Sequence, residues 1–128
     1  MRSSKRVAKQ PTQERERVLT QAVINAADIM GLKQVGLADV LGVSESSVSR
    51  MKSGAYLLKA EHKEWELAAL LVRLFRGLDA IMAGDERALR SWLEAYNNAL
   101  RDAPINLIGK VSGLTRTVDY VDAYRARV

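Results

Sequence analysis

The sequence predicts an all-α fold in a single small protein. The helix formers Ala, Leu, Arg and Glu are abundant among its 128 residues, of which 48% are hydrophobic and only 5% aromatic. Apolar residues recur at helical spacing along most of the chain, and no stretch alternates convincingly as a strand would. A chain of this length supplies enough apolar material for one core.

Composition also argues against several functional classes. The chain has no cysteine, which excludes disulfides, thiolate zinc sites and iron–sulfur clusters, and its single histidine, His62, leaves acid–base catalysis little to use. No apolar run approaches the ~20 residues of a membrane span. The N-terminus lacks the apolar core of a signal peptide. We therefore expect a cytoplasmic protein that is not an enzyme, needs no cofactor or metal, and does not bind membranes.

The net charge of +5 is concentrated near the N-terminus. Residues 1–17 carry six basic and two acidic side chains, so an acidic polymer would meet this end of the chain first. Residues 1–11 are small, basic and serine-containing and end at Pro11, which predicts a disordered basic arm. A merely solubilising tail would have the same composition.

The first folded unit is predicted over residues 12–60. Thr12 is a suitable N-cap for a helix that ends at Gly31, and two short helices follow over 33–41 and 45–51. The apolar positions of the first helix predict a buried stripe of Val18, Ala22, Val23, Ala26, Ile29 and Met30.

The second unit is predicted over residues 61–128. Its first helix, over 62–82, has an apolar stripe too broad for one small core, so we expect this helix, Phe75 included, to serve both the core and a dimer interface. Asp85 is expected to cap the next helix and Pro104 to begin another, and Gly113 is expected to break the chain. The predicted helices are 85–100, with Ala88, Leu89, Trp92, Leu93 and Tyr96 buried; 104–111; and 115–127, with Val118, Val121 and Tyr124 on one face.

The stretch QVGLADVLGVSESSVSRMKS, residues 34–53, has the pattern of a helix, a tight turn and a second helix. Ala38 is small where the two helices would touch, and Gly42 adopts the positive φ of the turn at little cost. Ser44 is placed to cap the second helix so that its first N–H groups point toward DNA. The apolar residues that would close the wedge are Leu37, Leu41, Val43, Val48 and Met51.

The sequence LADVLGVSESSVSRMKSG resembles the motif of the Xre family of phage-repressor-like regulators. The resemblance covers roughly residues 17–58. In such a unit the second helix enters the major groove. Its serines would touch base edges or phosphates, Glu45 would accept from a cytosine amino group, Arg50 would read guanine or a phosphate, and Gln34 would contact a phosphate. The alternative is a solvated serine face, with Glu45 stabilising only the helix dipole. The predicted DNA-binding residues are Gln34, Ser44, Glu45, Ser46, Ser47, Ser49, Arg50 and Lys52.

Few of these residues are basic. Arg50 and Lys52 are the only cations of the second helix, which predicts modest affinity for a monomer and favours a homodimer on palindromic half-sites of operator DNA.

The second half resembles the C-terminal domain of the Xre–MbcA–ParS antitoxins. The resemblance rests on Trp92-Leu93, on Asn97-Asn98 and Leu100 leading to Ala103-Pro104, on PINLI before Gly113-Leu114, and on VDYV followed by Arg125. It implies the antitoxin of a type II toxin–antitoxin system. Such a protein binds and neutralises a RES-domain toxin, which resembles ADP-ribosyltransferases and destroys NAD, and it represses its own operon.

The last helix is the expected toxin-binding element. Its end carries two arginines and the terminal carboxylate, an anion that could mimic a phosphate in the toxin's pocket. The alternative is that these residues only complete the protein's own core. The predicted toxin-binding residues are Tyr120, Tyr124, Arg125, Arg127 and Val128.

A second function remains open from the sequence. The chain could be a free-standing Xre-type transcriptional repressor whose C-terminal half dimerises or senses a small effector. A neighbouring gene for a RES-type toxin would discriminate between the two.

Overall fold

The computed structural model describes the backbone of residues 2–127 and the side chains of residues 12–127. This part of the chain forms seven α-helices and no strand beyond an isolated bridge between Asn97 and Asp102, which confirms the predicted all-α class. The helices are α1 (Arg2–Met30), α2 (Gln34–Leu41), α3 (Glu45–Ser53), α4 (Lys63–Ile81), α5 (Glu86–Glu94), α6 (Pro104–Leu107) and α7 (Val111–Arg127).

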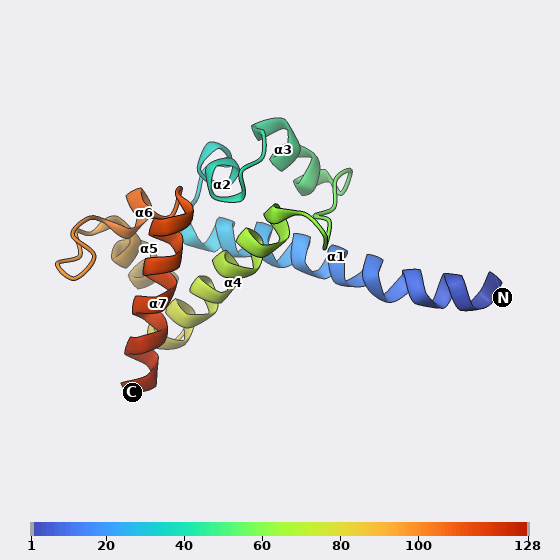
Figure 1. Ribbon diagram of the computed structural model, residues 1–128. Helices are drawn as coiled ribbons and strands as arrows, with labels where there is room; N and C mark the ends of the chain where they lie inside the picture. Colours follow the sequence, from blue (N-terminus) through green and yellow to red (C-terminus); the bar gives the residue numbers. More distant parts are fainter. Residues whose placement is uncertain (1, 128) are drawn as a thin grey trace.

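Helix α4 forms the centre of the molecule (Figure 1). Its most extensive contacts are with α7 and α1, and it also packs against α2 and α5. Because the apolar face of α4 is shared among these partners, one core extends through both halves of the chain. The fully or nearly fully buried residues of α4 are Ala68, Leu71, Leu74 and Leu78.

Two close contacts hold α4 on α7 and α5 on α1. Gly77 of α4 lies so near α7 that a Cβ at this position would be 2.7 Å from Cγ1 of Val121. Arg90 of α5 donates from Nε to the carbonyl of Ile29 at 2.7 Å and from Nη2 to that of Asp28 at 3.0 Å. Arg90 thereby gives a partner to the Ile29 carbonyl at the end of α1 and a second one to the Asp28 carbonyl, which also accepts from the N–H of Gly31.

Helix α1 differs from the prediction in two ways. It begins at Arg2, so the described backbone is helical where the sequence analysis expects a disordered arm and a cap at Thr12. Arg, Lys, Ala and Gln are good helix formers, and lengthening a helix adds a hydrogen bond per residue. The prediction that Val18 is buried was wrong: its side chain is 60% exposed, and Glu16 and Thr20 lie in the buried stripe instead.

The prediction of one helix over residues 85–100 was wrong for its second half. Asp85 caps α5 as predicted, its Oδ1 accepting from the N–H of Ala88 at 3.1 Å, but the helix ends at Glu94. Oδ1 of Asn97 accepts from the N–H groups of Ala99 and Leu100 at 2.9 and 3.0 Å, a local arrangement that competes with a helix. Tyr96 is consequently 67% exposed instead of buried.

The prediction that Gly113 breaks the chain was also wrong. Gly113 is a buried residue in the first turn of α7, and a Cβ there would overlap the backbone carbonyl of Leu107. The glycine is needed for the close approach of α6 to α7. On α4, Phe75 is half-buried at the edge of the core, and the expected dimer contact of this helix stays a prediction.

Candidate DNA interface and toxin-binding surface

The helix-turn-helix frame forms as predicted in α2 and α3. Gly42 ends α2 with φ 69°, and the N–H of Val43 donates to the Ala38 carbonyl at 3.1 Å. The residues that close the wedge are buried, except that Val43 is half-buried: Leu37, Ala38, Leu41, Val48 and Met51 are at most 5% exposed. The two helices are therefore held in one rigid unit.

Ser44 caps α3 as predicted. Its Oγ accepts from the N–H of Ser47 at 3.1 Å and lies 3.1 Å from Oγ of Ser46 and 3.0 Å from Oγ of Ser47. A cap leaves the first N–H groups of the helix at a defined position with a partial positive charge, which suits an anion such as a DNA phosphate. In this cluster Ser44 and Ser46 are exposed and Ser47 is half-buried.

The remaining predicted DNA-binding residues share one outward face of α3 or lie beside its start. Glu45, Ser49, Arg50 and Lys52 are exposed, and Nη2 of Arg50 donates to Oγ of Ser47 at 3.3 Å. Gln34, half-buried at the start of α2, donates from Nε2 to the carbonyl of Glu45 at 3.0 Å. The amide of Gln34 has a second N–H donor, so this bond leaves capacity for the predicted phosphate contact.

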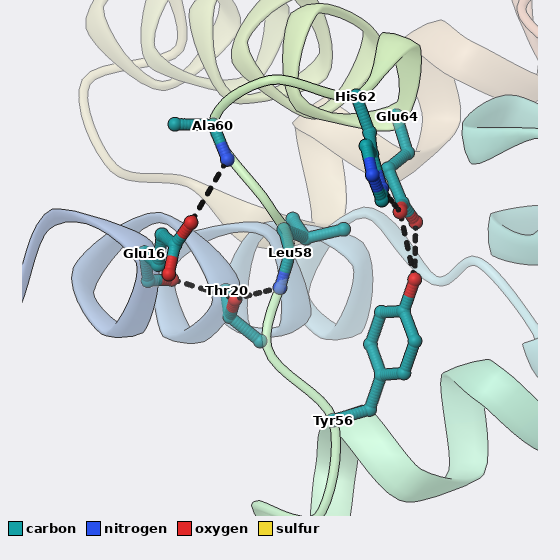
Figure 2. Close-up of polar contacts among 7 residues, drawn as sticks. All are labelled: Glu16, Thr20, Tyr56, Leu58, Ala60, His62 and Glu64. Atoms are coloured by element: carbon teal, nitrogen blue, oxygen red, sulfur yellow. Dashed lines mark hydrogen bonds and ion pairs between the residues drawn. The ribbon is translucent and has the colours of Figure 1, made fainter. Parts of the chain in front are cut away.

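The segment after α3 is fastened to α1 by side chains (Figure 2). Oγ1 of Thr20 accepts from the N–H of Leu58 at 2.9 Å and donates to the carbonyl of Glu16 at 2.7 Å, while Oε2 of Glu16 accepts from the N–H of Ala60 at 3.0 Å. We call this segment, residues 54–62, the strap; its Leu58 is fully buried. The strap fixes how α3 sits on the rest of the molecule.

A second polar cluster joins the end of the helix-turn-helix unit to α4. The hydroxyl of Tyr56 donates to the Glu64 carboxylate, with distances of 2.7 and 2.9 Å to its two oxygens, and Nδ1 of His62 lies 3.2 Å from Oε1 (Figure 2). Burial, followed by the hydrogen bond and charge of Glu64, raises the pKa of Tyr56 from its ordinary 10 to about 12. The hydroxyl therefore stays protonated and keeps donating well into alkaline solution.

The raised pKa of Tyr56 predicts an alkaline loss of stability. The unfolded chain releases this proton near pH 10 and the folded chain near pH 12, so the stabilisation is complete below pH 10 and is lost as the pH rises to about 12. Urea unfolding over this range should show a steeper fall for the wild type than for Tyr56→Phe, which has no hydroxyl to ionise. Parallel curves for the two proteins would contradict the assignment.

Sequence reasoning missed the strap and the Tyr56–Glu64 cluster. One signal was present: Glu16 and Thr20 are four residues apart, in register with the apolar stripe of α1. Polar residues that share the buried face of a helix need hydrogen-bond partners, although the sequence did not indicate which.

The C-terminal unit is built on α5, α6 and α7. Trp92 stacks on Tyr120 with ring centroids 6.3 Å apart, and Nη2 of Arg116 donates to the Leu100 carbonyl at 3.1 Å. The first contact holds α5 against α7, and the second holds the loop between α5 and α6 against α7. Leu93 and Leu114 are fully buried in the same unit.

The predicted toxin-binding residues divide between core and surface. Tyr120 is half-buried against Trp92, Tyr124 is 46% exposed, and Arg125 and Arg127 are exposed. Val128 lies outside the described residues. In Figure 1, α3 lies at the top of the molecule and the end of α7 at the bottom, so the two predicted surfaces are well separated.

Fold and geometry define a helix-turn-helix protein with an added C-terminal helical unit. Residues 9–73 match the antitoxin Xre-like helix-turn-helix domain, and residues 73–127 match the antitoxin Xre/MbcA/ParS C-terminal toxin-binding domain. The chain therefore belongs to the Xre-like antitoxins of toxin–antitoxin systems. A search of curated proteins found no match.

These matches confirm the two resemblances stated from the sequence. The two matched domains meet at Arg73, inside the unbroken helix α4, whereas the sequence analysis divides the units near residue 60.

In the described residues, no helix is long and apolar enough to cross a membrane.

Proposed function

We propose that this antitoxin neutralises a RES-type, NAD-degrading toxin and represses the operon that encodes the pair. It acts in this proposal as a binding protein for DNA and for the toxin, without catalysis. The observation that carries the proposal is the separation of two surfaces on one rigid chain: the exposed polar face of α3, and the exposed end of α7 in the matched toxin-binding domain. Such a chain has the geometry to hold DNA and toxin at once.

Repression is proposed to act through α3. Its capped start, the exposed serines and Arg50 are the groups that would meet the major groove and the flanking phosphates. Because α3 carries only two cations, we propose that two copies bind palindromic half-sites together. Because cations that contact phosphates release counterions from DNA, operator affinity should fall as the salt concentration rises.

Neutralisation is proposed to act through the end of α7. Tyr124, Arg125 and Arg127 are exposed there, and the two arginines can pair with acidic groups at the rim of the toxin's NAD pocket. The runner-up is a free-standing repressor, which would have no toxin to bind.

The test is to co-express the antitoxin with the RES-type toxin from the neighbouring gene. The wild type should co-purify with the toxin and protect growth and cellular NAD. Deletion of residues 125–128 should abolish that protection while operator binding and circular dichroism stay unchanged. Full protection by the truncated protein would place neutralisation elsewhere, and the lack of any toxin gene or complex would favour the free-standing repressor.

A further inference from the structure

A groove of about 830 Å³ lies between α1, α4 and α7, apart from the DNA-facing helix α3. We call it the α1–α4 groove. Val18 of α1 is 60% exposed beside it, and Trp65 of α4 is half-buried in it. Its apolar lining consists of Val18, Leu19, Ala22, Trp65, Ala69 and Val72.

The dimensions of this groove suit a helix. On α1 the lining residues run from Glu14 to Ala22, about two turns or ~12 Å, and on α4 from Trp65 to Arg76, about three turns or ~16 Å. Ala22 and Ala69 are small and lie between the larger side chains along each helix. Small residues in the floor allow another helix to approach closely, as in the recognition of amphipathic helices by apolar grooves.

The charges around the groove are mostly positive. Arg73 pairs with Asp122 at 2.7 Å, and the guanidinium of Arg15 lies over the Trp65 ring at 5.7 Å. Arg76 and Arg125 also line the groove, and its second carboxylate, Glu14, pairs with Arg17 outside it at 4.0 Å. Among the described side chains, no carboxylate pairs with Arg15, Arg76 or Arg125.

We propose that the α1–α4 groove holds an amphipathic helix of the toxin whose flanks are acidic; this inference rests on the proposed function. Three arginines without a carboxylate partner would pair with those flanks while the apolar floor receives the helix's apolar face. The groove is also continuous with the proposed toxin-binding end of α7, because Arg125 belongs to both. Toxin recognition would thus extend across the first matched domain as well as the second.

A second copy of this chain fits the groove less well. It would bring the same surplus of arginines to the contact, and like charges placed together oppose association. A homodimer on DNA would then use a surface other than this groove.

The test measures binding of a catalytically inactive RES-type toxin to full-length antitoxin variants. Arg76→Glu and Val18→Asp change exposed residues of the groove, so both should fold with the circular dichroism of the wild type. Each should weaken the Kd for toxin about tenfold or more. Arg87→Glu, the same charge reversal on an exposed residue of α5 outside the groove, should bind toxin like the wild type.

Hydrogen exchange supplies an independent measurement. Toxin should protect amides of residues 14–22 and 65–76 in the wild type, and replacing an acidic flank residue of the toxin helix by Arg should restore binding to Arg76→Glu. Unchanged Kd values for both groove variants overturn the inference while leaving the proposed function intact. A groove variant that alters sedimentation of the free protein without altering toxin affinity overturns it in favour of a self-interface. If the wild type binds no toxin, the proposed function itself is wrong and the inference falls with it.

Discussion

Gly113→Ala should lower the free energy of unfolding by about 3 kcal/mol, the upper end of the usual cost of overpacking. The added Cβ would overlap the Leu107 carbonyl, and a backbone group cannot move aside as a flexible side chain can. Helix propensity alone predicts the opposite sign, since Ala is favoured over Gly by up to about 1 kcal/mol within a helix. The sign of the change in unfolding free energy, measured by urea unfolding, therefore decides between overpacking and helix propensity.

Gly109→Ala is the matched control for this experiment. A Cβ at Gly109 would meet Cβ of Asp39 at 3.8 Å, an ordinary contact. We expect a change within about 0.5 kcal/mol, as for surface substitutions away from special features. If Gly113→Ala were as stable as this control, the close packing of α6 on α7 would not be a constraint on the fold.

Arg50→Ala should weaken binding to the protein's own promoter by about 1–3 kcal/mol, the cost of losing a bidentate contact to guanine. Arg50 lies on the exposed face of α3, and its only hydrogen bond from the side chain to another described residue is the one to Ser47. Its removal should therefore leave the fold intact. Gel-shift titration at constant salt measures the effect, because affinity for DNA depends steeply on ionic strength.

Arg87→Ala provides the control for lost charge, since Arg87 is an exposed residue of α5 outside the helix-turn-helix unit. It should bind the promoter nearly as the wild type does. If Arg50→Ala combined with Ser46→Ala bound DNA like this control, α3 would not be the reading helix.

Local patterns predicted much of the fold. The turn at Gly42, the caps at Ser44 and Asp85 and the limits of α2 each depend on interactions within a few residues, which a sequence displays directly. The candidate DNA-binding residues of α3 could be predicted for the same reason. Their spacing along one short helix sets which of them face outward.

The predictions that were wrong concern features set by contacts between residues far apart in the sequence. The hydrogen bonds of Glu16 and Thr20 link residues about 40 positions apart, so the sequence could not indicate that they displace Val18 from the buried face. Gly113 was misread because a glycine serves equally well to break a helix or to admit a close neighbour. The α1–α4 groove likewise exists only once three separate helices are assembled.

The most direct measurement of the central claim is cellular NAD during co-expression of the RES-type toxin with Arg50→Ala and with the protein lacking residues 125–128. Expression from a promoter that the antitoxin does not regulate keeps the amounts equal. The account predicts that NAD is protected by Arg50→Ala, although it binds the operator weakly, and falls with the truncated protein, although it binds the operator normally. Loss of protection with Arg50→Ala, or full protection by the truncated protein, would contradict the assignment of repression and neutralisation to opposite ends of the molecule.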